Sequence, residues 1–321
     1  MKKLLSYLKK YGFLYTFVYI LFKVGLVKNI PTALLLKRQQ YYAKLTDEEQ
    51  KKELADFYEN AVGKKLNFDS PKSFSEKIQW MKFYQSTELK VFLADKYEAP
   101  KYIKEHFPEI NIIPQLGVWN NANDIDFDKL PDQFVLKCNH GSAMNIIVKD
   151  KSKLNVKKTC KILNDWMKVD FDLSTGMFEK HYKYITKKII AEKYIEEPDG
   201  NLHDYKFHCF GGKPKYIEFI GDRVFNTHFV HSSIYTTDWK KTNICFNDDE
   251  PYEQAFSKPE KLEKMLELAE KMAKDFNYVR VDFYYIQNEI YFGELTFTPD
   301  SGIIKFNPPE IDDQWGAMIE L

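Results

Sequence analysis

Hydrophobic positions recur with different periods along the chain, and these periods predict its secondary structure. A charged pattern with helical spacing spans residues 47–60. A second helix is expected after Ser73, because Ser73 and Glu76 have the spacing of a capping box, and a third from about Pro259 to Phe276. Short apolar runs predict strands at Phe134–Lys137, Asn145–Val148, Lys188–Ile195, Tyr205–Phe210 and Tyr216–Ile220.

The order of these elements favours an α+β fold over a doubly wound parallel sheet. We expect three parts: a basic, aromatic helical segment (1–46), an N-terminal lobe of alternating short strands and helices (47–130), and a strand-rich part (131–321). No linker rich in Pro, Gly or Ser separates two domains, so the lobes are expected to share a cleft. Asp312–Trp315 is expected to begin a last helix.

The end of the chain predicts a hairpin with carboxylates on one face. Its strands are Val279–Ile286 and Glu289–Phe297. Since side chains alternate along a strand, Arg280 and Asp282 share a face. A two-residue turn at Gln287-Asn288 would pair Asp282 with Gly293. A three-residue loop, 287–289 with Asn288 left-handed, would instead pair Asp282 with Glu294.

We predict the three-residue loop. It also pairs Arg280 with Thr296 and places the apolar side chains on one face of the hairpin. That face comprises Val281, Phe283, Tyr285, Tyr291 and Leu295. A register shifted by one residue would distribute them over both faces. Two carboxylates directly across a ladder repel each other unless a cation lies between them. A site with only a few carboxylate oxygens favours Mg²⁺, because water and substrate phosphates can supply the other ligands of its coordination shell. The alternative is a solvated sheet face, but the surrounding aromatic sequence indicates burial.

A lysine at the end of an apolar strand suggests a second charged site. Lys137 ends the strand that begins at Phe134 and is followed by Cys138-Asn139-His140-Gly141-Ser142. A lysine placed beside a glycine loop can meet a phosphate, and loop amides with the Ser142 hydroxyl can cap one. An ordinary hairpin turn explains the same pattern equally well, and the sequence is no Walker A motif.

The first 46 residues contain nine basic and no acidic residues. Between them Tyr11–Val27 is aromatic and aliphatic, but it is short for a bilayer span and contains Lys23. No small-residue cleavage site follows it, as a signal peptide would require. Two interpretations remain open. One is an interfacial helix with tyrosines and phenylalanines at headgroup depth, and the other is a helix packed on the protein's own surface.

Composition excludes several function classes. Lysine plus arginine and aspartate plus glutamate each number 47, which leaves no net charge and argues against nucleic-acid binding. The four cysteines form no C-x-x-C pair, which argues against a zinc site or a disulfide framework and fits a reducing compartment. His228 and His231 lack neighbouring ligands at metal spacing and are expected to be ordinary strand or loop residues.

Taken in chain order, these motifs resemble the ATP-grasp superfamily and, more closely, its TupA-like family, from about Lys65 to the C-terminus. The matching features are Asp95-Lys96, the Lys137 loop, the Glu192-Lys193-Tyr194-Ile195 strand, Asp204-Tyr205-Lys206, the Arg280/Asp282 and Glu294 pair, and Gly293–Gly302. ATP-grasp ligases usually carry asparagine at the place of Thr296, so the role of Thr296 as a direct ligand differs from the family pattern.

The resemblance implies an ATP-grasp fold of two α+β lobes that bind ATP with Mg²⁺, and it implies roles for single residues. Lys137 and Lys96, with His140, Gly141 and Ser142, would bind phosphates. Glu192 and the backbone of Lys193, Tyr194 and Ile195 would hold adenine and ribose. Asp282 and Glu294, with Thr296, would hold Mg²⁺. Arg280 would stabilise the transferred phosphoryl group, and Lys206 or Arg223 would contact it or the acceptor carboxylate.

The family further implies a ligase joining a carboxylate, of a uronic acid or an amino acid, to an amine in bacterial surface polysaccharide synthesis. Residues 1–46 would place it in the cytoplasm, at the inner face of the plasma membrane. Two alternatives remain. One is a kinase on the same scaffold that phosphorylates a sugar or polyol. The other is a glycosyltransferase or a non-catalytic component of polysaccharide assembly.

Overall fold

The computed structural model describes residues 2–23, 30–196, 202–221, 231–247, 249 and 251–321. Its helices are α1 (Lys2–Lys23), α2 (Thr32–Tyr42), α3 (Asp47–Val62), α4 (Phe74–Tyr84), α5 (Glu88–Ala94), α6 (Ala99–His106), α7 (Val156–Met167), α8 (Phe171–Ser174), α9 (Leu262–Ala273) and α10 (Ile311–Ala317). Its strands are β1 (Gln115–Trp119), β2 (Phe134–Cys138), β3 (Asn145–Val148), β4 (Ile189–Lys193), β5 (Asp204–Phe210), β6 (Lys213–Ile220), β7 (Ser233–Thr236), β8 (Cys245–Phe246), β9 (Tyr278–Ile286), β10 (Glu289–Thr296) and β11 (Phe306–Asn307).

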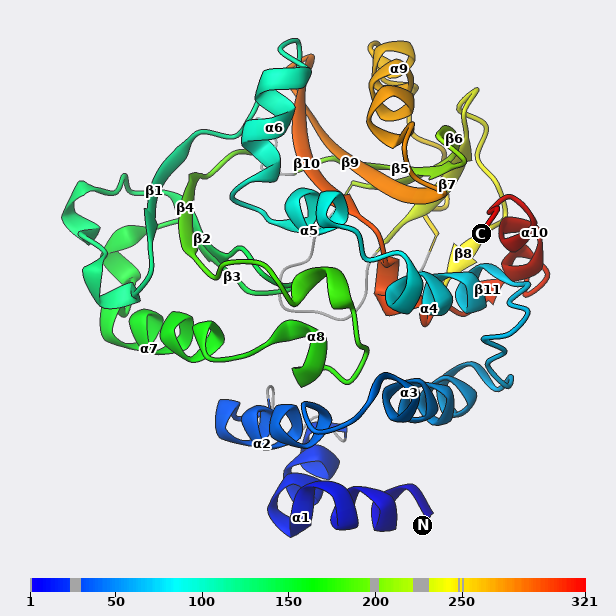
Figure 1. Cartoon of the computed structure of the whole chain (residues 1–321). Coiled ribbons are helices and arrows are strands. Elements are labelled where there is room, and N and C mark those ends of the chain that lie inside the picture. Colours follow the sequence, from blue (N-terminus) through cyan, green and yellow to red (C-terminus); the bar gives the residue numbers. More distant parts are fainter. Residues whose placement is uncertain (1, 24–29, 197–201, 222–230, 248, 250) are drawn as a thin grey trace.

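The described strands pair antiparallel in two main sheets (Figure 1). One sheet has the order β1-β4-β2-β3 and carries α7, and the other has the order β10-β9-β5-β6-β7. Strands β8 and β11 form a small ladder beside α10. This arrangement of antiparallel sheets with segregated helices confirms the predicted α+β class.

Helix boundaries follow local capping. Ser73 caps α4 and forms the predicted capping box with Glu76. The expected alternation of strands and helices before Leu130 was wrong, because this region holds α3 to α6 and, as its strand, β1. Thr87 explains part of the difference. Its hydroxyl accepts a hydrogen bond from the Lys90 amide and thereby starts a helix in an apolar run that resembles a strand.

The β9–β10 hairpin has the predicted pairing but not the predicted turn. Asp282 pairs with Glu294 and Arg280 with Thr296, as expected. The turn, however, has two residues, Gln287 and Asn288, both left-handed (φ 48° and 63°). A bulge between Phe292 and Glu294 supplies the residue that the predicted longer loop would have supplied.

Gly293 lies at this bulge, where an added Cβ would stand 2.8 Å from the Asp282 carbonyl oxygen. The bulge also corrects the predicted apolar face. Tyr291 pairs with Tyr284, and Ile290 and Phe292 join the core in its place. Only a glycine permits this close approach of the two backbones.

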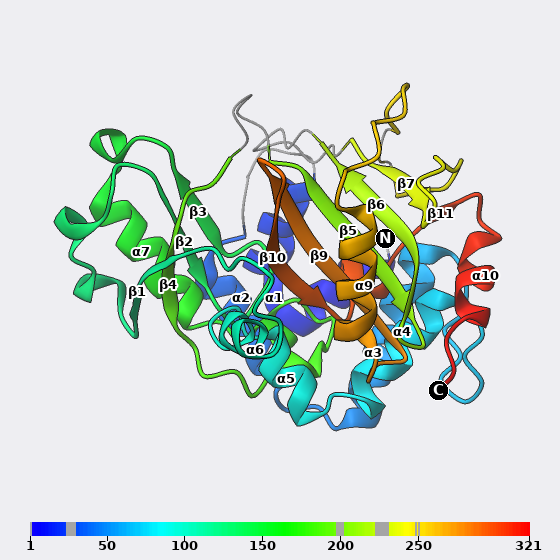
Figure 2. The same ribbon diagram turned by 90° about the horizontal axis from the view of Figure 1, so that it is seen from above.

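One face of the β10-β9-β5-β6-β7 sheet is apolar and packs against α9, with α5 and α6 near β10 (Figure 2). Helix α9 contributes Leu262, Met265, Leu268 and Met272 to this core. At one end of the opposite face, α4, α10 and the β8–β11 ladder form a second core around the fully buried Trp315. The rest of that face carries polar side chains.

Helices α1 to α3 lie beneath the two sheets (Figure 1). They pack through a cluster that includes Tyr11, Tyr15, Tyr42 and Leu54, together with Phe178 from the strand-rich part. Among the described helices, none is both long and apolar enough to cross a bilayer.

Candidate active site

A row of charged side chains crosses four adjacent strands on the polar sheet face. Register places Glu218 (β6) beside Lys206 (β5), Lys206 beside Asp282 (β9), and Asp282 beside Glu294 (β10). The neighbouring row holds Tyr216, His208, Arg280 and Thr296. Because side chains alternate, the residues between these positions face the apolar core, and the polar ones converge on one surface.

Asp282 is held by two cations. Arg280 donates to both of its carboxylate oxygens, at 2.8 and 2.7 Å, and the Lys206 ammonium donates to Oδ2 at 2.8 Å. Lys206 also contacts Asp204 at 2.9 Å. The Asp282 side chain is only 3% exposed, so this charge is buried and compensated, as a buried charge must be. The arrangement fixes the orientation of both Arg280 and Asp282.

Glu294 is partly exposed and interacts with cations from its own sheet and from the segment after α5. Its Oε2 accepts from Lys96 at 2.7 Å, its Oε1 accepts from the Thr296 hydroxyl at 3.2 Å, and Arg280 lies 3.6 Å away. Lys96, ahead of Arg280 and Lys206, lowers the pKa of Glu294 well below its usual value. The side chain is 38% exposed, so an incoming ligand can reach it.

The sheet that contains β2 and β4 contributes a second ion pair. Lys137 donates to Glu192, and both project from the face opposite the core residues Leu136 and Ala191. The Glu192 carboxylate also acts on Lys96. Burial lowers the pKa of Lys96, but Glu294 and Glu192 outweigh burial and raise it. A chain of alternating charges therefore runs from Lys137 to Asp282 across the two sheets.

Asn139 and Asp95 hold the Lys137 loop near Lys96. The Asn139 amide donates to Asp95 Oδ1 at 2.8 Å and accepts from the Lys188 N–H at 2.6 Å, while the Lys96 N–H donates to the Asn139 carbonyl at 3.3 Å. These bonds tie the end of β2 to the segment after α5. They explain why Lys96, although distant in sequence, lies beside the end of β2.

The loop residues that were expected to bind phosphates, His140, Gly141 and Ser142, differ in their exposure to solvent. Ser142 is exposed, whereas Gly141 packs on Phe171, which an added Cβ would approach to 2.6 Å. His140 is 1% exposed, and its ring nitrogens have no hydrogen-bond partner among the described residues. Burial lowers the pKa of His140 to about 4, so its ring is neutral and lies in the interior. At His140 only the backbone is available to a ligand.

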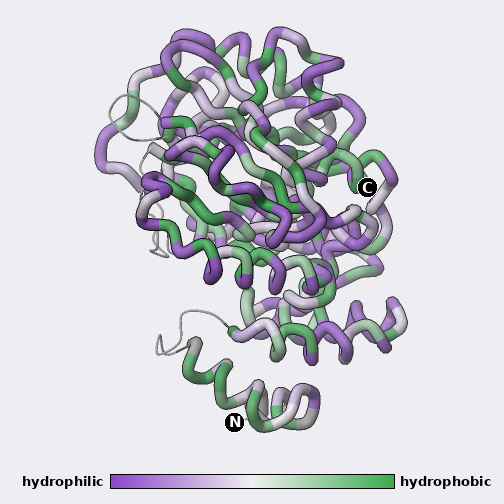
Figure 3. Tube along the Cα trace, turned by 90° about the vertical axis from the view of Figure 1, so that its left-hand side faces the viewer, coloured by the Kyte–Doolittle hydropathy of each residue, from purple (hydrophilic) through white to green (hydrophobic). Residues whose placement is uncertain are grey.

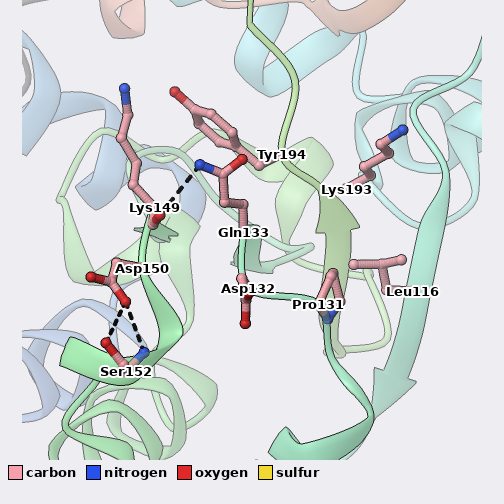
Figure 4. A pocket seen from close by; sticks show the side chains of 9 residues that line it. All are labelled: Leu116, Pro131, Asp132, Gln133, Lys149, Asp150, Ser152, Lys193 and Tyr194. Carbon is pink, nitrogen blue, oxygen red and sulfur yellow. Dashed lines mark hydrogen bonds between the residues drawn. The ribbon is translucent and has the colours of Figure 1, made fainter.

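The end of β4 opens on a pocket of about 920 Å³ (Figure 4). Lys193 and Tyr194 line it, with Leu116 near Lys193 and Gln133 and Lys149 near Tyr194. Tyr194 donates a hydrogen bond to Glu196 at 2.5 Å. Neither Asp282 nor Glu294 lines this pocket, so it is separate from the carboxylate row. Ile195 follows Tyr194 and is half-buried.

The segment after β10 is fixed by two buried residues, Lys82 of α4 and Glu179. Asp300 and Ser301 are left-handed (φ 45° and 53°). The Lys82 ammonium donates to the Ser301 carbonyl at 2.7 Å, and the hydroxyls of Thr298 and Ser301 donate to Glu179. These contacts hold an otherwise unfavourable backbone in place directly after β10.

The carboxylates can hold a magnesium ion. Asp282 and Glu294 are direct neighbours across the ladder, and the Thr296 hydroxyl lies beside Glu294. Mg²⁺ takes one or two protein carboxylates and obtains its other ligands from water and phosphates. Among the described residues, no three acidic, His or Cys side chains form a metal-ligand group by themselves.

The sequence did not reveal Glu218 and His208 as members of this surface. Glu218 is 7% exposed, and its Oε2 lies 3.6 Å from His208 Nε2. Although burial raises the pKa of Glu218, His208, Lys206 and Arg280 together lower it. The available signal was a polar residue at alternate positions of an apolar strand. Arg223, predicted to meet phosphate or acceptor, and His228 lie outside the described residues.

A sheet pair that brings lysines and two acidic residues together between lobes defines an ATP-grasp architecture. The family model described as TupA-like ATPgrasp matches residues 76–320, and the chain belongs to that family. This confirms the family and the fold predicted from the sequence.

The solved structures to which the chain is similar include several ligases. A D-alanine–D-alanine ligase from Helicobacter pylori is 18% identical (77% of this chain and 69% of that chain covered; TM-score 0.42). Another from Bacillus anthracis, solved with ATP, is 20% identical (64% and 54%; TM-score 0.35). A phosphoribosylamine–glycine ligase from Thermotoga maritima is 10% identical (67% and 51%; TM-score 0.39). The chain thus spans about half to two thirds of these proteins. No curated protein matches it.

Proposed function

We propose that this protein is an ATP-dependent carboxylate–amine ligase that uses Mg²⁺ and acts in bacterial surface polysaccharide synthesis. The observation that carries the proposal is the row Glu218, Lys206, Asp282 and Glu294, flanked by Arg280 and joined to the other sheet through Lys96. Cations and carboxylates placed together in this way suit phosphoryl transfer, which depends chiefly on positioning and charge neutralisation.

Each residue has a distinct part in the proposed reaction. Lys137 and Lys96 would bind the phosphates of ATP, and the β4 end at Lys193–Ile195 would hold adenine, with Glu192 at the ribose. Asp282 and Glu294 would hold Mg²⁺, which supplies charge neutralisation at the phosphates. Arg280 and Lys206, both oriented by Asp282, would bind the transferred phosphoryl group and the acceptor carboxylate.

The chemistry has two displacements. An oxygen of the acceptor carboxylate attacks the γ-phosphorus, the bond to the β-phosphate oxygen breaks, and ADP leaves. The amine nitrogen then attacks the carbonyl carbon of the acyl phosphate, phosphate leaves, and the nitrogen loses a proton. Closure of the lobes would exclude water from the acyl phosphate, which hydrolyses readily. We propose a uronic acid or an amino acid as the carboxylate, acted on in the cytoplasm near the inner membrane face.

The decisive experiment supplies Mg-ATP, a panel of uronic and amino acids, and hydroxylamine as the amine. A ligase forms the hydroxamate of its acceptor together with ADP. A kinase on the same scaffold forms a phosphate ester without any amine. Asp282→Asn and Glu294→Gln should each reduce ADP formation by more than about 100-fold, because each removes a charge needed in the transition state. Asp238→Asn, on an exposed turn, is the control.

If wild-type protein forms no ADP with any acceptor and binds no ATP, the proposal fails, and a non-catalytic component of polysaccharide assembly becomes the better interpretation.

A further inference from the structure

The second half of α1 presents a wholly apolar face to solvent. Phe13, Leu14, Phe17 and Ile20 are 72, 56, 48 and 39% exposed, and they follow one another at helical spacing. The Phe13 and Phe17 rings stack with centroids 6.1 Å apart. Four large apolar side chains on one exposed face form a patch of the kind that marks an interaction surface.

The opposite face of α1 is fixed to the protein by tyrosines. Tyr15 is 1% exposed and accepts a hydrogen bond from Arg38 at 3.1 Å, and Tyr11 donates to the Tyr42 hydroxyl at 2.5 Å. At Gly12 the backbone leaves helical geometry (φ 82°), which joins two differently directed helical segments. The tyrosines therefore pack inward, contrary to the expectation that they lie at headgroup depth.

The two interpretations of the N-terminal segment concern different faces of one helix, of which the structure shows one to be packed and the other to be exposed. The tyrosine face packs on α2, whereas the Phe13 face points away from it. Figure 3 shows the hydrophobic half of α1 at the lower edge of the molecule, where a flat surface can reach it.

The charge of the segment indicates what covers this face. Residues 1–46 carry nine lysines and arginines and no acidic residue, and Lys2, Lys3, Lys9, Lys10 and Lys23 belong to α1 itself. Of these, Lys10 pairs with Glu53 of α3 at 2.5 Å. Lys37 and Lys44 are exposed on and beside α2. In a symmetric dimer of this face, each basic segment would meet its own copy, with no acidic residue of the segment to oppose it. Anionic lipid headgroups provide the opposite charge.

We propose that α1 lies in the plane of an anionic bilayer surface, with Phe13, Leu14, Phe17 and Ile20 inserted at the level of the upper acyl chains. The net positive charge of residues 1–46 then faces the headgroups, and α2 connects the helix to the rest of the protein. This surface does not depend on the ligase chemistry. It would hold the cleft close to substrates that are attached to lipid.

The test is sedimentation of the full-length chain with vesicles of phosphatidylcholine alone or of equal parts phosphatidylcholine and phosphatidylglycerol. Wild type should bind the anionic vesicles and be released by high salt. Phe13→Ser/Phe17→Ser should lower the vesicle affinity by roughly tenfold or more, since insertion scales with buried apolar area. Tyr184→Ser, which replaces a side chain that is 69% exposed elsewhere, should bind as wild type.

Several results separate this proposal from its alternatives. Equal binding by the double variant, or none by wild type, overturns it. So does a dimer of the lipid-free protein that the double variant dissociates in light scattering, because a second copy would then cover the face. Thermal unfolding of the double variant should match wild type, since it changes only exposed positions. Asp282→Asn should bind vesicles normally, so failure here and failure of the proposed reaction are distinguishable.

Discussion

At the scale of single residues, the charged side chains of the candidate site are each compensated by a neighbour of opposite charge. Three cations surround the Asp282 and Glu294 pair, and each has a carboxylate partner within 3 Å. Lys90 differs, because its side chain is buried (6% exposed) and the described residues provide its ammonium with only the Phe297 ring, 5.6 Å from the centroid. Burial lowers the pKa of Lys90 to about 8. A buried, uncompensated lysine makes the stability of the fold depend on pH.

Lys90→Met should change that dependence in a defined direction. Between pH 8 and about 10.4, the ordinary lysine pKa, the unfolded chain holds the proton that folded Lys90 has lost, so this residue's contribution to stability rises with pH. The free energy of unfolding of wild type relative to Lys90→Met should therefore increase from pH 7 to pH 10, by at most about 3 kcal/mol. Urea unfolding at several pH values measures it.

Lys213→Met is the exposed control for this series, with a side chain that is 60% exposed. A difference between wild type and Lys90→Met that stays constant with pH would show that Lys90 is charged in the folded protein throughout. It would also show that solvent reaches its ammonium.

At the scale of elements, the β9–β10 hairpin determines whether the carboxylates meet. The two-residue turn alone would pair Asp282 with Gly293, and the bulge at Gly293 restores the pairing with Glu294. The bulge is possible because Gly293 has no Cβ, which would stand only 2.8 Å from the Asp282 carbonyl oxygen. Backbone geometry and the pairing of Asp282 with Glu294 are therefore coupled through one glycine.

Gly293→Ala should destabilise the fold by about 1–3 kcal/mol, because the added methyl group collides with backbone that cannot move freely. It should also weaken Mg-ATP binding, since relief of the clash displaces Glu294 from Asp282. Calorimetric titration and urea unfolding measure the two effects. Gly211→Ala, left-handed (φ +51°) but with open space at the Cβ, should lose stability without losing nucleotide affinity.

Helix α10 closes the second core through Trp315, which is fully buried and stacks on Tyr216 at 4.9 Å between centroids. Trp315→Ala should lower the free energy of unfolding by about 3–5 kcal/mol, as large cavities in cores do. Denaturant unfolding provides the measurement. Trp80→Ala, at a half-buried position of α4, should cost distinctly less. Equal losses for both would mean that the core around Trp315 collapses to fill the cavity.

For the whole molecule, ligand binding should join the two sheets more tightly. Lys96 already links the sheets by charge, because it pairs with Glu294 of β10 and also interacts with Glu192 of β4. Mg-ATP would enter between them. A ligand at 100 times its dissociation constant stabilises a fold by about 2.7 kcal/mol.

Mg-ATP should therefore raise the melting temperature of wild type by several degrees in differential scanning fluorimetry, whereas ATP with EDTA should raise it much less. Lys96→Met should abolish most of the increase, because the phosphates lose a cation and Glu294 loses its partner. Lys264→Met, on the exposed side of α9, should retain it. An equal increase in Lys96→Met would place the nucleotide away from this cleft.

Local patterns were sufficient to predict much of the fold. The strands β2, β3, β5, β9 and β10 and the helices α3, α4 and α9 were predicted close to their observed bounds, because periodicity and capping act over a few residues. The pairing of Asp282 with Glu294 was also predicted, although through a longer turn. A bulge depends on the partner strand as well as on its own sequence, so hairpin composition did not reveal it.

By itself, the sequence determined the residue types of the site, the α+β class, the family resemblance and the basic, apolar character of the first 46 residues. These follow from composition and short-range spacing. Only the tertiary structure decided that Glu218 and His208 join the polar face, that Lys96 reaches Glu294, that the His140 ring points inward, and which face of α1 is exposed. Each of these depends on contacts between segments far apart in the chain, where packing and burial, rather than local propensity, fix the outcome.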